Sequence, residues 1–208
     1  MKRHLLAVST AALLAACASA PVVEHSKMTG AEIAQIDAVL KRDFRAKGQA
    51  KMTRLEPDAV QRECNLHADN PPDSVARSLQ EAQLKTIKYP SDSLLGDWKN
   101  GRKIAESGRG MQWNEKPANP GGGGCYNCHQ LSPQQTSHGT LGPSLKGFGK
   151  TRGYGPDMQR YAYGKIYNAK AYSACSHMPR FGHSGSLSEQ QIKDLVAYLL
   201  DPKSPVNQ

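Results

Sequence analysis

The sequence predicts an all-α protein, because helical patterns recur along the chain. The first observation is spacing: near the C-terminus, apolar residues follow positions i, i+3, i+4, i+7 and i+8, at Ile192, Leu195, Val196, Leu199 and Leu200. The second is capping, since residues 188–191 and, near the other end, 29–32 form capping boxes in front of such patterns. The third is that strand signals are weak everywhere, so we expect no sheet.

The length and charge of the chain limit the classes of protein to which it can belong. Its 208 residues suffice for one domain with a substantial extension. The formal net charge is +9, and an exported form that has lost Lys2 and Arg3 keeps +7 (9 − 2). Export argues against nucleic acid as a partner, so the charge indicates either a surface for an anionic partner or substrate, or simply a soluble basic protein. No segment after residue 20 is long and apolar enough to span a bilayer.

Residues 1–20 have the pattern of a secretory signal, which predicts a periplasmic protein. A positively charged start at 1–4 precedes a short apolar stretch at 5–16. The end of the signal has two interpretations. Leu14-Ala15-Ala16-Cys17 resembles a lipobox, which would make Cys17 a lipidated N-terminus and anchor the protein to the membrane. Cleavage within the small residues 16–20 would instead remove Cys17.

Residues 21–90 are expected to form a helical N-terminal extension. Its first helix carries a single apolar stripe that must lie against something, formed by Ile33, Ile36, Val39, Leu40 and Phe44. A second, short helix begins near Pro57 and carries Cys64, and residues 69–73 break it. A third helical pattern covers 75–87, and residues 89–92 close the extension.

Residues 91–208 contain Cys125-Tyr126-Asn127-Cys128-His129, the attachment pattern of a c-type haem. On one helical turn, Cys125 and Cys128 can each form a thioether with one haem vinyl group, and His129 then reaches the iron. A zinc site would need a second pair of ligands, and a thioredoxin-like redox pair would need βαβ surroundings; the sequence offers neither. We therefore expect one covalent haem c in a class I-like, monohaem cytochrome c domain at 91–208.

The segments around this motif fit such a domain. A helix is expected at 94–107, and a flexible, glycine-rich loop at 117–124 leads into Cys125. In the turn 139–145, the carbonyl of Pro143 is the candidate acceptor for the second ring N–H of His129, although an ordinary turn is the alternative interpretation. Tyr163 lies in an aromatic-rich segment, 157–167, and is expected to line the haem pocket or to belong to the ordinary core.

Met178 is the best-placed candidate for the second axial ligand of the iron. It lies in His177-Met178-Pro179-Arg180-Phe181-Gly182, where proline and glycine restrict the backbone just before the last helix. An imidazole is the alternative ligand, from His177 or, less well placed, from His138 or His183. Arg180 is a candidate partner for a haem propionate, and a solvated arginine is the other interpretation.

The five cysteines can all be assigned. Two belong to the haem motif, and Cys17 belongs either to a lipid anchor or to the removed signal. In an oxidising compartment, Cys64 and Cys175 are expected to form a disulfide, which would join the extension to the loop of Met178. A reactive free thiol at Cys175 is the alternative.

These segments together resemble a known family, the sulfur-oxidation cytochromes SoxX, which are the monohaem subunits of SoxAX complexes. The haem motif is common to all c-type cytochromes, so the resemblance depends mainly on residues 174–182 and on the C-terminal Leu-Asp-Pro-Lys-Ser-Pro-Val-Asn at 200–207. Further matching segments are 94–99, 107–110, 125–130 and 139–145.

The resemblance implies a periplasmic electron-transfer subunit with His129 and Met178 on the haem iron, paired with a larger, SoxA-like haem subunit. Such a heterodimer is an L-cysteine S-thiosulfotransferase, which oxidatively joins thiosulfate to a cysteine of a sulfur-carrier protein and passes the electrons to a downstream cytochrome c. The sulfur chemistry belongs to the larger subunit, so neither independent catalytic activity nor a catalytic residue is expected in this chain.

Two alternatives are a free-standing periplasmic electron carrier and a haem peroxidase-type enzyme. A free carrier needs no stable partner, so the apolar stripe of the helix at 31–44 should then pack wholly on its own domain. A peroxidase needs an open or displaceable sixth position on the iron.

Overall fold

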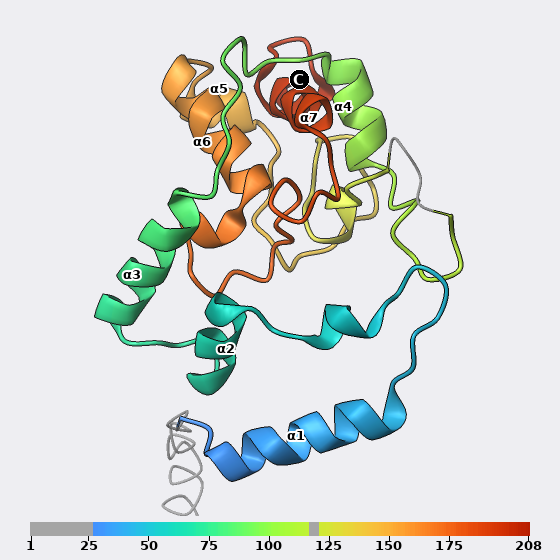
Figure 1. Cartoon of the computed structure of the whole chain (residues 1–208). Helices are drawn as coiled ribbons and strands as arrows, with labels where there is room; N and C mark the ends of the chain where they lie inside the picture. Colours follow the sequence, from blue (N-terminus) through green and yellow to red (C-terminus); the bar gives the residue numbers. More distant parts are fainter. Residues whose placement is uncertain (1–26, 117–120) are drawn as a thin grey trace, which may run out of the picture.

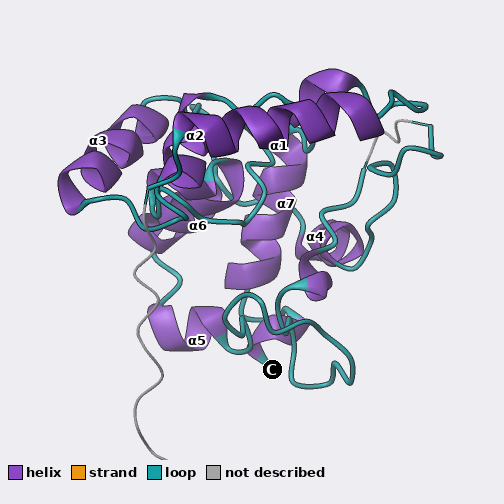
Figure 2. Ribbon diagram, turned by 90° about the horizontal axis from the view of Figure 1, so that it is seen from below, coloured by secondary structure: helices purple, strands orange, loops and turns teal. Residues whose placement is uncertain are grey.

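The computed structural model describes residues 27–116 and 121–208, and it is helical throughout, with no β-strand in those ranges. Figures 1 and 2 show the helices joined by long loops. The α-helices are α1 (Gly30–Asp43), α2 (Ala59–Leu66), α3 (Asp73–Leu84), α4 (Trp98–Ala105), α5 (Phe148–Arg152), α6 (Pro156–Tyr167) and α7 (Glu189–Leu200). Short 3₁₀ helices cover Met52–Leu55, Cys125–Asn127, Ala169–Ala171 and Pro205–Asn207. The all-α, class I-like cytochrome fold predicted from the sequence is confirmed.

Helix α7 is the centre of the core, and every residue from Gln191 to Leu200 is buried. The predicted capping box is present, because Ser188 accepts a hydrogen bond from the Gln191 amide while the Gln191 side chain accepts one from the Ser188 amide. Helix α4 crosses α7 very closely. A Cβ atom added at Gly101 would lie 2.0 Å from the carbonyl oxygen of Asp194, so this crossing requires glycine.

The predicted helix at 94–107 is shorter in the structure, where α4 begins only at Trp98. The residues before it are held by α7 instead: the Gly96 amide donates to the Lys193 carbonyl at 3.0 Å, and the Asp97 amide donates to the Asp194 carboxylate at 2.9 Å. Asp97 then caps α4 through the Lys99 amide at 2.8 Å. A tertiary contact therefore overrides helix propensity at 94–97.

The C-terminal residues join α5 to α7. The Asn207 side chain, which is buried, accepts hydrogen bonds from the amides of Gly149 (2.9 Å) and Lys150 (3.3 Å). Its NH₂ group donates to the carbonyls of Leu199 and Asp201, each at 3.0 Å. Asn207 thus satisfies backbone groups at the start of α5 and at the end of α7, which gives the C-terminal residues a structural role.

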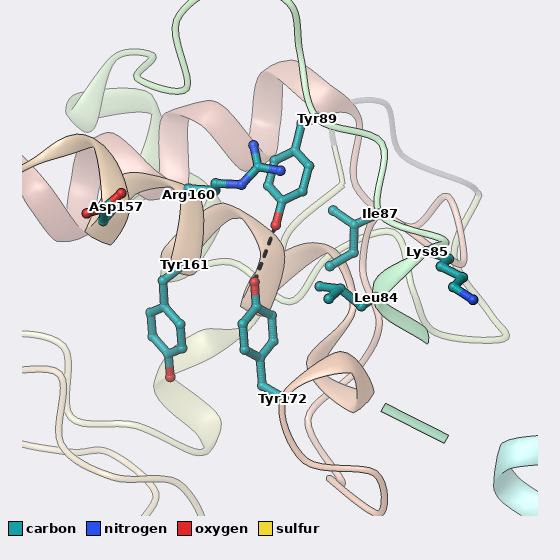
Figure 3. Close-up of a pocket in the computed structure, with 8 residues that line it drawn as sticks. All are labelled: Leu84, Lys85, Ile87, Tyr89, Asp157, Arg160, Tyr161 and Tyr172. Atoms are coloured by element: carbon teal, nitrogen blue, oxygen red, sulfur yellow. Dashed lines mark hydrogen bonds between the residues drawn. The ribbon is translucent and has the colours of Figure 1, made fainter. Parts of the chain in front are cut away.

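Helix α3 and the segment after it pack on α6 and on the 3₁₀ turn that follows α6. The buried Asn168 side chain donates to Gln83 (3.0 Å) and to Thr86 (2.9 Å). Figure 3 shows that the hydroxyl groups of Tyr89 and Tyr172, 3.3 Å apart, point toward each other. They border an open pocket of about 460 Å³ that is lined by Leu84, Lys85, Ile87, Tyr89, Asp157, Arg160, Tyr161 and Tyr172.

Helix α1 lies apart from the other helices, below them in Figure 1. Its two ends are attached: the Met28 amide donates to the Leu66 carbonyl at 3.0 Å, and beyond its C-terminus the Lys47 ammonium lies 3.6 Å from the ring centroid of Trp113. Between these ends none of its residues is buried. Ile36 is 48% exposed and Val39 is 45% exposed, so the described part of the chain leaves much of the apolar stripe uncovered. Every helix in the described ranges is too short or too polar to cross a membrane.

Candidate functional site

The haem motif lies on a short turn that the end of α4 holds in place. Gly123 and Gly124 donate their amide protons to the carbonyls of Ile104 and Ser107, each at 2.8 Å. A Cβ atom at Gly122 would lie 1.9 Å from the Ser107 carbonyl oxygen. The glycines at 121–124 therefore allow the backbone to pack directly on α4, instead of forming the flexible approach that we expected; residues 117–120 lie outside the described ranges.

The two motif cysteines lie at either end of the 3₁₀ turn Cys125–Asn127, and the His129 amide donates to the Cys125 carbonyl at 3.0 Å. Both thiols are free in the structure. Burial raises the pKa of Cys125 to about 12, so its thiol is neutral at pH 7 and has none of the character of a reactive thiolate. Two cysteines three positions apart, as Cys125 and Cys128 are, are suited to thioether attachment of a haem.

The His129 ring is fixed by the turn at 139–145. Its Nδ1 lies 2.7 Å from the carbonyl oxygen of Pro143, and because a carbonyl only accepts, Nδ1 carries the proton. The neutral ring therefore has its lone pair on Nε2, the nitrogen that can bind a metal. Gly142 lies against the same ring: a Cβ atom there would be 2.2 Å from His129 Cε1, and the Gly142 amide donates to the Cys128 carbonyl at 2.8 Å.

Met178 is half-buried and packs against the same hydrophobic core as Cys125, Tyr126 and Leu145. His177, its closest rival as a ligand, points elsewhere: its side chain is 86% exposed, and Nε2 lies 3.0 Å from the Asp69 carboxylate. His138 contacts the carbonyl of its own neighbour, Gly139, and His183 is exposed. Met178 is therefore placed against the hydrophobic core of the domain, whereas the ring of His177 faces the extension.

Arg180 lies against the N-terminal extension. Its Nη2 is 2.6 Å from the Asp58 carboxylate, and its Nη1 donates to the Gln83 side chain at 3.2 Å. Burial works to raise the pKa of Asp58, but the Gln61 amide and the Arg180 guanidinium outweigh it, and the pKa is lowered overall. A contact between Arg180 and a haem propionate stays a prediction.

The expected disulfide between Cys64 and Cys175 is present, with Cα atoms 5.4 Å apart. It joins α2 to the loop that carries Met178. Asp69 lies close to both sulfur atoms, yet the two sulfurs are bonded to each other, so this group is not a metal site. Cys17, the candidate for lipidation, lies outside the described ranges.

Two buried tyrosines test whether the domain fits a haem. The hydroxyl groups of Tyr163 and Tyr198 are buried and have no hydrogen-bond partner within the described residues. Burial raises the pKa of Tyr163 above its ordinary value and that of Tyr198 to about 12, so both phenols are neutral donors at pH 7. Buried donors normally have an acceptor, and the carboxylates of a haem are acceptors of the kind that these two lack. Together with the free thiols and the oriented His129, they fit a bound haem.

Sequence reasoning missed the partners of the loop that carries Met178. Asp58, Asp69 and Gln83 all come from the extension, and each contacts a polar side chain of that loop. Asp58 was visible only as the start of a helix, and nothing in the sequence pairs it with a residue so distant along the chain.

Comparisons with known proteins agree with this site. Residues 122–202 match the family model of cytochrome c. A lipoprotein of Aquifex aeolicus (strain VF5), described as uncharacterised, is 33% identical over 193 residues, which cover 90% of each protein. Among solved structures, a chain of the SoxXA crystal structure from P. pantotrophus has 25% identity and a TM-score of 0.40, over 57% of this chain and 90% of that one. The chain therefore belongs to the family of the Aquifex lipoprotein, and it contains the cytochrome c domain of an electron-transfer protein with covalent haem.

Proposed function

We propose that this chain is the monohaem electron-transfer subunit of a periplasmic, thiosulfate-oxidising complex of the SoxAX type. In that role Cys125 and Cys128 hold one haem c, and His129 and Met178 are its axial ligands. The partner is a SoxA-like haem subunit, and the pair acts as an L-cysteine S-thiosulfotransferase on a sulfur-carrier protein. The electrons then leave to a downstream cytochrome c.

When bound, the haem supplies a one-electron redox couple. The residues of the chain set the conditions for that couple. The Pro143 carbonyl orients His129 and increases its basicity, and a thioether from Met178 would raise the reduction potential relative to a second imidazole. A sixth position taken by Met178 also argues against a peroxidase, which needs that position free.

The observation that carries the subunit role is the uncovered stripe of α1. A free-standing carrier should bury this stripe on its own domain, yet Ile36, Val39 and Phe44 each remain close to half exposed. By helical spacing, Glu32 and Asp37 border the stripe, while Asp43 is paired with Arg42 at 2.7 Å. An exposed apolar stripe with charges of both signs beside it favours a protein partner that presents a matching apolar patch.

The Aquifex relative supports a lipid anchor at Cys17, because it is a lipoprotein that aligns along 90% of this chain. Such an anchor would keep the complex on the periplasmic face of a membrane. Mass spectrometry of the mature N-terminus tests the anchor by itself: an acylated Cys17 supports it, and an unmodified N-terminus after residue 17 contradicts it.

Affinity purification from detergent-treated native cells tests the subunit role. We expect the tagged protein to retain a second haem protein in equal amount, and we expect thiosulfate together with the carrier protein to reduce the haem of this complex. A tagged Met178→Leu variant is the matched control, because it should keep the partner while its electron transfer changes. A monomer that stays without a partner at low salt and is inert to thiosulfate would contradict the proposal.

A further inference from the structure

The loop at 175–180, which we call the Met178 loop, is held by the N-terminal extension at three points. Cys175 is bonded to Cys64, His177 Nε2 lies 3.0 Å from the Asp69 carboxylate, and Arg180 Nη2 lies 2.6 Å from the Asp58 carboxylate. These contacts fall on both sides of Met178 along the chain. The loop has no helix or strand of its own at these positions, so its conformation depends on such contacts.

The contact through Arg180 is the most protected of the ionic ones. The Arg180 side chain is only 14% exposed, and its second nitrogen donates to Gln83, so the guanidinium is held by two residues of the extension. Hydrogen bonds between charged groups are stronger than neutral ones, and shielding from water strengthens them further. The His177 contact, by comparison, is largely exposed to solvent.

Asp58 is also held in place by hydrogen bonds within α2. Its Oδ1 accepts from the Gln61 amide at 2.9 Å, and its own amide donates to the Gln61 side chain at 3.0 Å, which makes it the N-cap of α2. Its other oxygen, Oδ2, faces Arg180. One carboxylate therefore sets both the start of α2 and the position of the Met178 loop.

At the other end of α2, a turn with positive φ angles places a second carboxylate beside the Met178 loop. Ala68 and Asp69 have φ angles of 46° and 62°, and they are the non-glycine residues with positive φ among those described. This turn closes α2, because the Asp69 amide donates to the Cys64 carbonyl at 2.8 Å. Such backbone conformations cost energy, of order 1 kcal/mol or more each, and persist where their surroundings require them. Here the turn brings Asp69 to His177.

We propose that Asp58 is a positioning residue for Met178, acting through Arg180, and that α2 as a whole holds the Met178 loop in its ligating position. The inference rests on the proposed ligation of the haem iron by Met178. A thioether is a weak axial ligand. The fraction of protein with Met178 on the iron therefore depends on whether the contacts of the loop outweigh the conformational entropy that the loop gains when it is released.

Competition for the sixth position of the iron tests this role. Imidazole binds the oxidised haem only after Met178 has left, and Met178 leaves when its loop, with Arg180, moves away from Asp58. A weaker hold therefore appears as tighter imidazole binding. We expect Asp58→Asn to bind imidazole about tenfold more tightly than wild type, a factor that corresponds to about 1.4 kcal/mol. Asparagine is also a good N-cap, so α2 should persist in this variant.

Asp92→Asn is the matched control. Asp92 forms another ion pair between the extension's end and the cytochrome domain, 2.8 Å from Lys193, but it does not contact the Met178 loop. We expect this variant to bind imidazole as the wild type does. A second variant, Asp69→Asn, tolerates the positive φ of that position and should tighten binding by a smaller factor than Asp58→Asn.

The outcomes separate this inference from the proposed ligation. If the imidazole affinities of Asp58→Asn and Asp92→Asn agree within twofold, whether both equal the wild type or both are tighter, the role of Asp58 is overturned. Thermal unfolding of the same samples shows any general loss of stability, which a merely structural role would produce without a change in imidazole affinity. Absence of the sulfur-to-iron charge-transfer band in the oxidised wild type would instead refute ligation by Met178.

Discussion

Gly142 illustrates how a single residue determines the geometry of the site. Its backbone lies so close to the His129 ring that an added Cβ atom would be 2.2 Å from Cε1. We expect Gly142→Ala to displace the ring or the turn and to lower the free energy of unfolding by about 1–3 kcal/mol. Chemical unfolding of the purified protein measures this loss. Gly108→Ala is the control, since a Cβ atom there meets nothing within 4 Å, and an equal loss in both variants would contradict the explanation.

The ion pair of Asp92 and Lys193 makes stability depend on pH. The hydrogen bond from Lys193 lowers the pKa of Asp92 in the folded protein. A lowered folded-state pKa adds stability above the unfolded value, about 3.9, and that stability is lost as the pH falls through the folded pKa. We expect Asp92→Asn to unfold more easily than wild type at pH 7 and equally easily near pH 2. Urea unfolding across this range is the measurement, and a pH-independent difference would contradict it.

At the residue scale, the chemistry of the haem motif could be predicted because each residue type there has a definite task. A cysteine pair with a following histidine specifies haem attachment, and the need to orient that histidine pointed to Pro143, whose carbonyl now lies 2.7 Å from Nδ1. The contact between Asp58 and Arg180 could not be predicted, because any exposed carboxylate can satisfy an arginine and only the folded chain selects one.

At the scale of elements, α4 and the residues before it pack closely on α7. Gly101 and Gly96 both face Asp194, and a Cβ atom at either position would lie about 2 Å from one of its oxygens. We expect Gly101→Ala to force the helices apart and to cost about 1–3 kcal/mol of unfolding free energy, despite the higher helix propensity of alanine. Gly30→Ala, at the open first turn of α1, should not destabilise the protein. If both variants change the unfolding free energy equally, the effect comes from helix propensity, and the explanation by the α4–α7 crossing is contradicted.

The helices that could be predicted well were those with a stop and start signal of their own. The capping boxes of α1 and α7 are present as expected, and Pro202 follows the end of α7. The start of α4 was predicted too early, because the amides of Gly96 and Asp97 bind α7. A sequence shows which segments favour a helix, but a contact with another element decides where that helix begins.

At the scale of the whole molecule, α1 stands out because the described residues leave much of its apolar stripe exposed. We expect the paired change Ile36→Ser and Val39→Ser to abolish retention of the haem-containing partner, because it removes apolar area from the exposed stripe. The haem spectrum should stay unchanged, since α1 contributes no buried residue to the core. Affinity purification with quantified haem measures both. The control is Ala34→Ser with Ala38→Ser, on the opposite side of the helix by spacing; a partner lost equally from the control would contradict a role for the stripe.

The overall fold class could be predicted from sequence patterns, but the contacts between the N-terminal helices and the haem-motif segments could not. The sequence indicated that an N-terminal extension precedes the haem domain and that a disulfide joins them. That α2 would face the Met178 loop, with Asp58, Cys64 and Asp69 each contacting a different residue, depends on how the connecting segments turn. The extension thus contacts the Met178 loop through the disulfide and two ion pairs.

The optical spectrum of the oxidised, haem-loaded protein tests the central claim most directly. If Cys125 and Cys128 hold a haem whose iron is bound by His129 and Met178, the sulfur-to-iron charge-transfer band is present in the wild type and vanishes in Met178→Leu. A wild type without this band, whether from a second imidazole or from an open sixth position, would contradict the account of the site and of the loop that positions Met178.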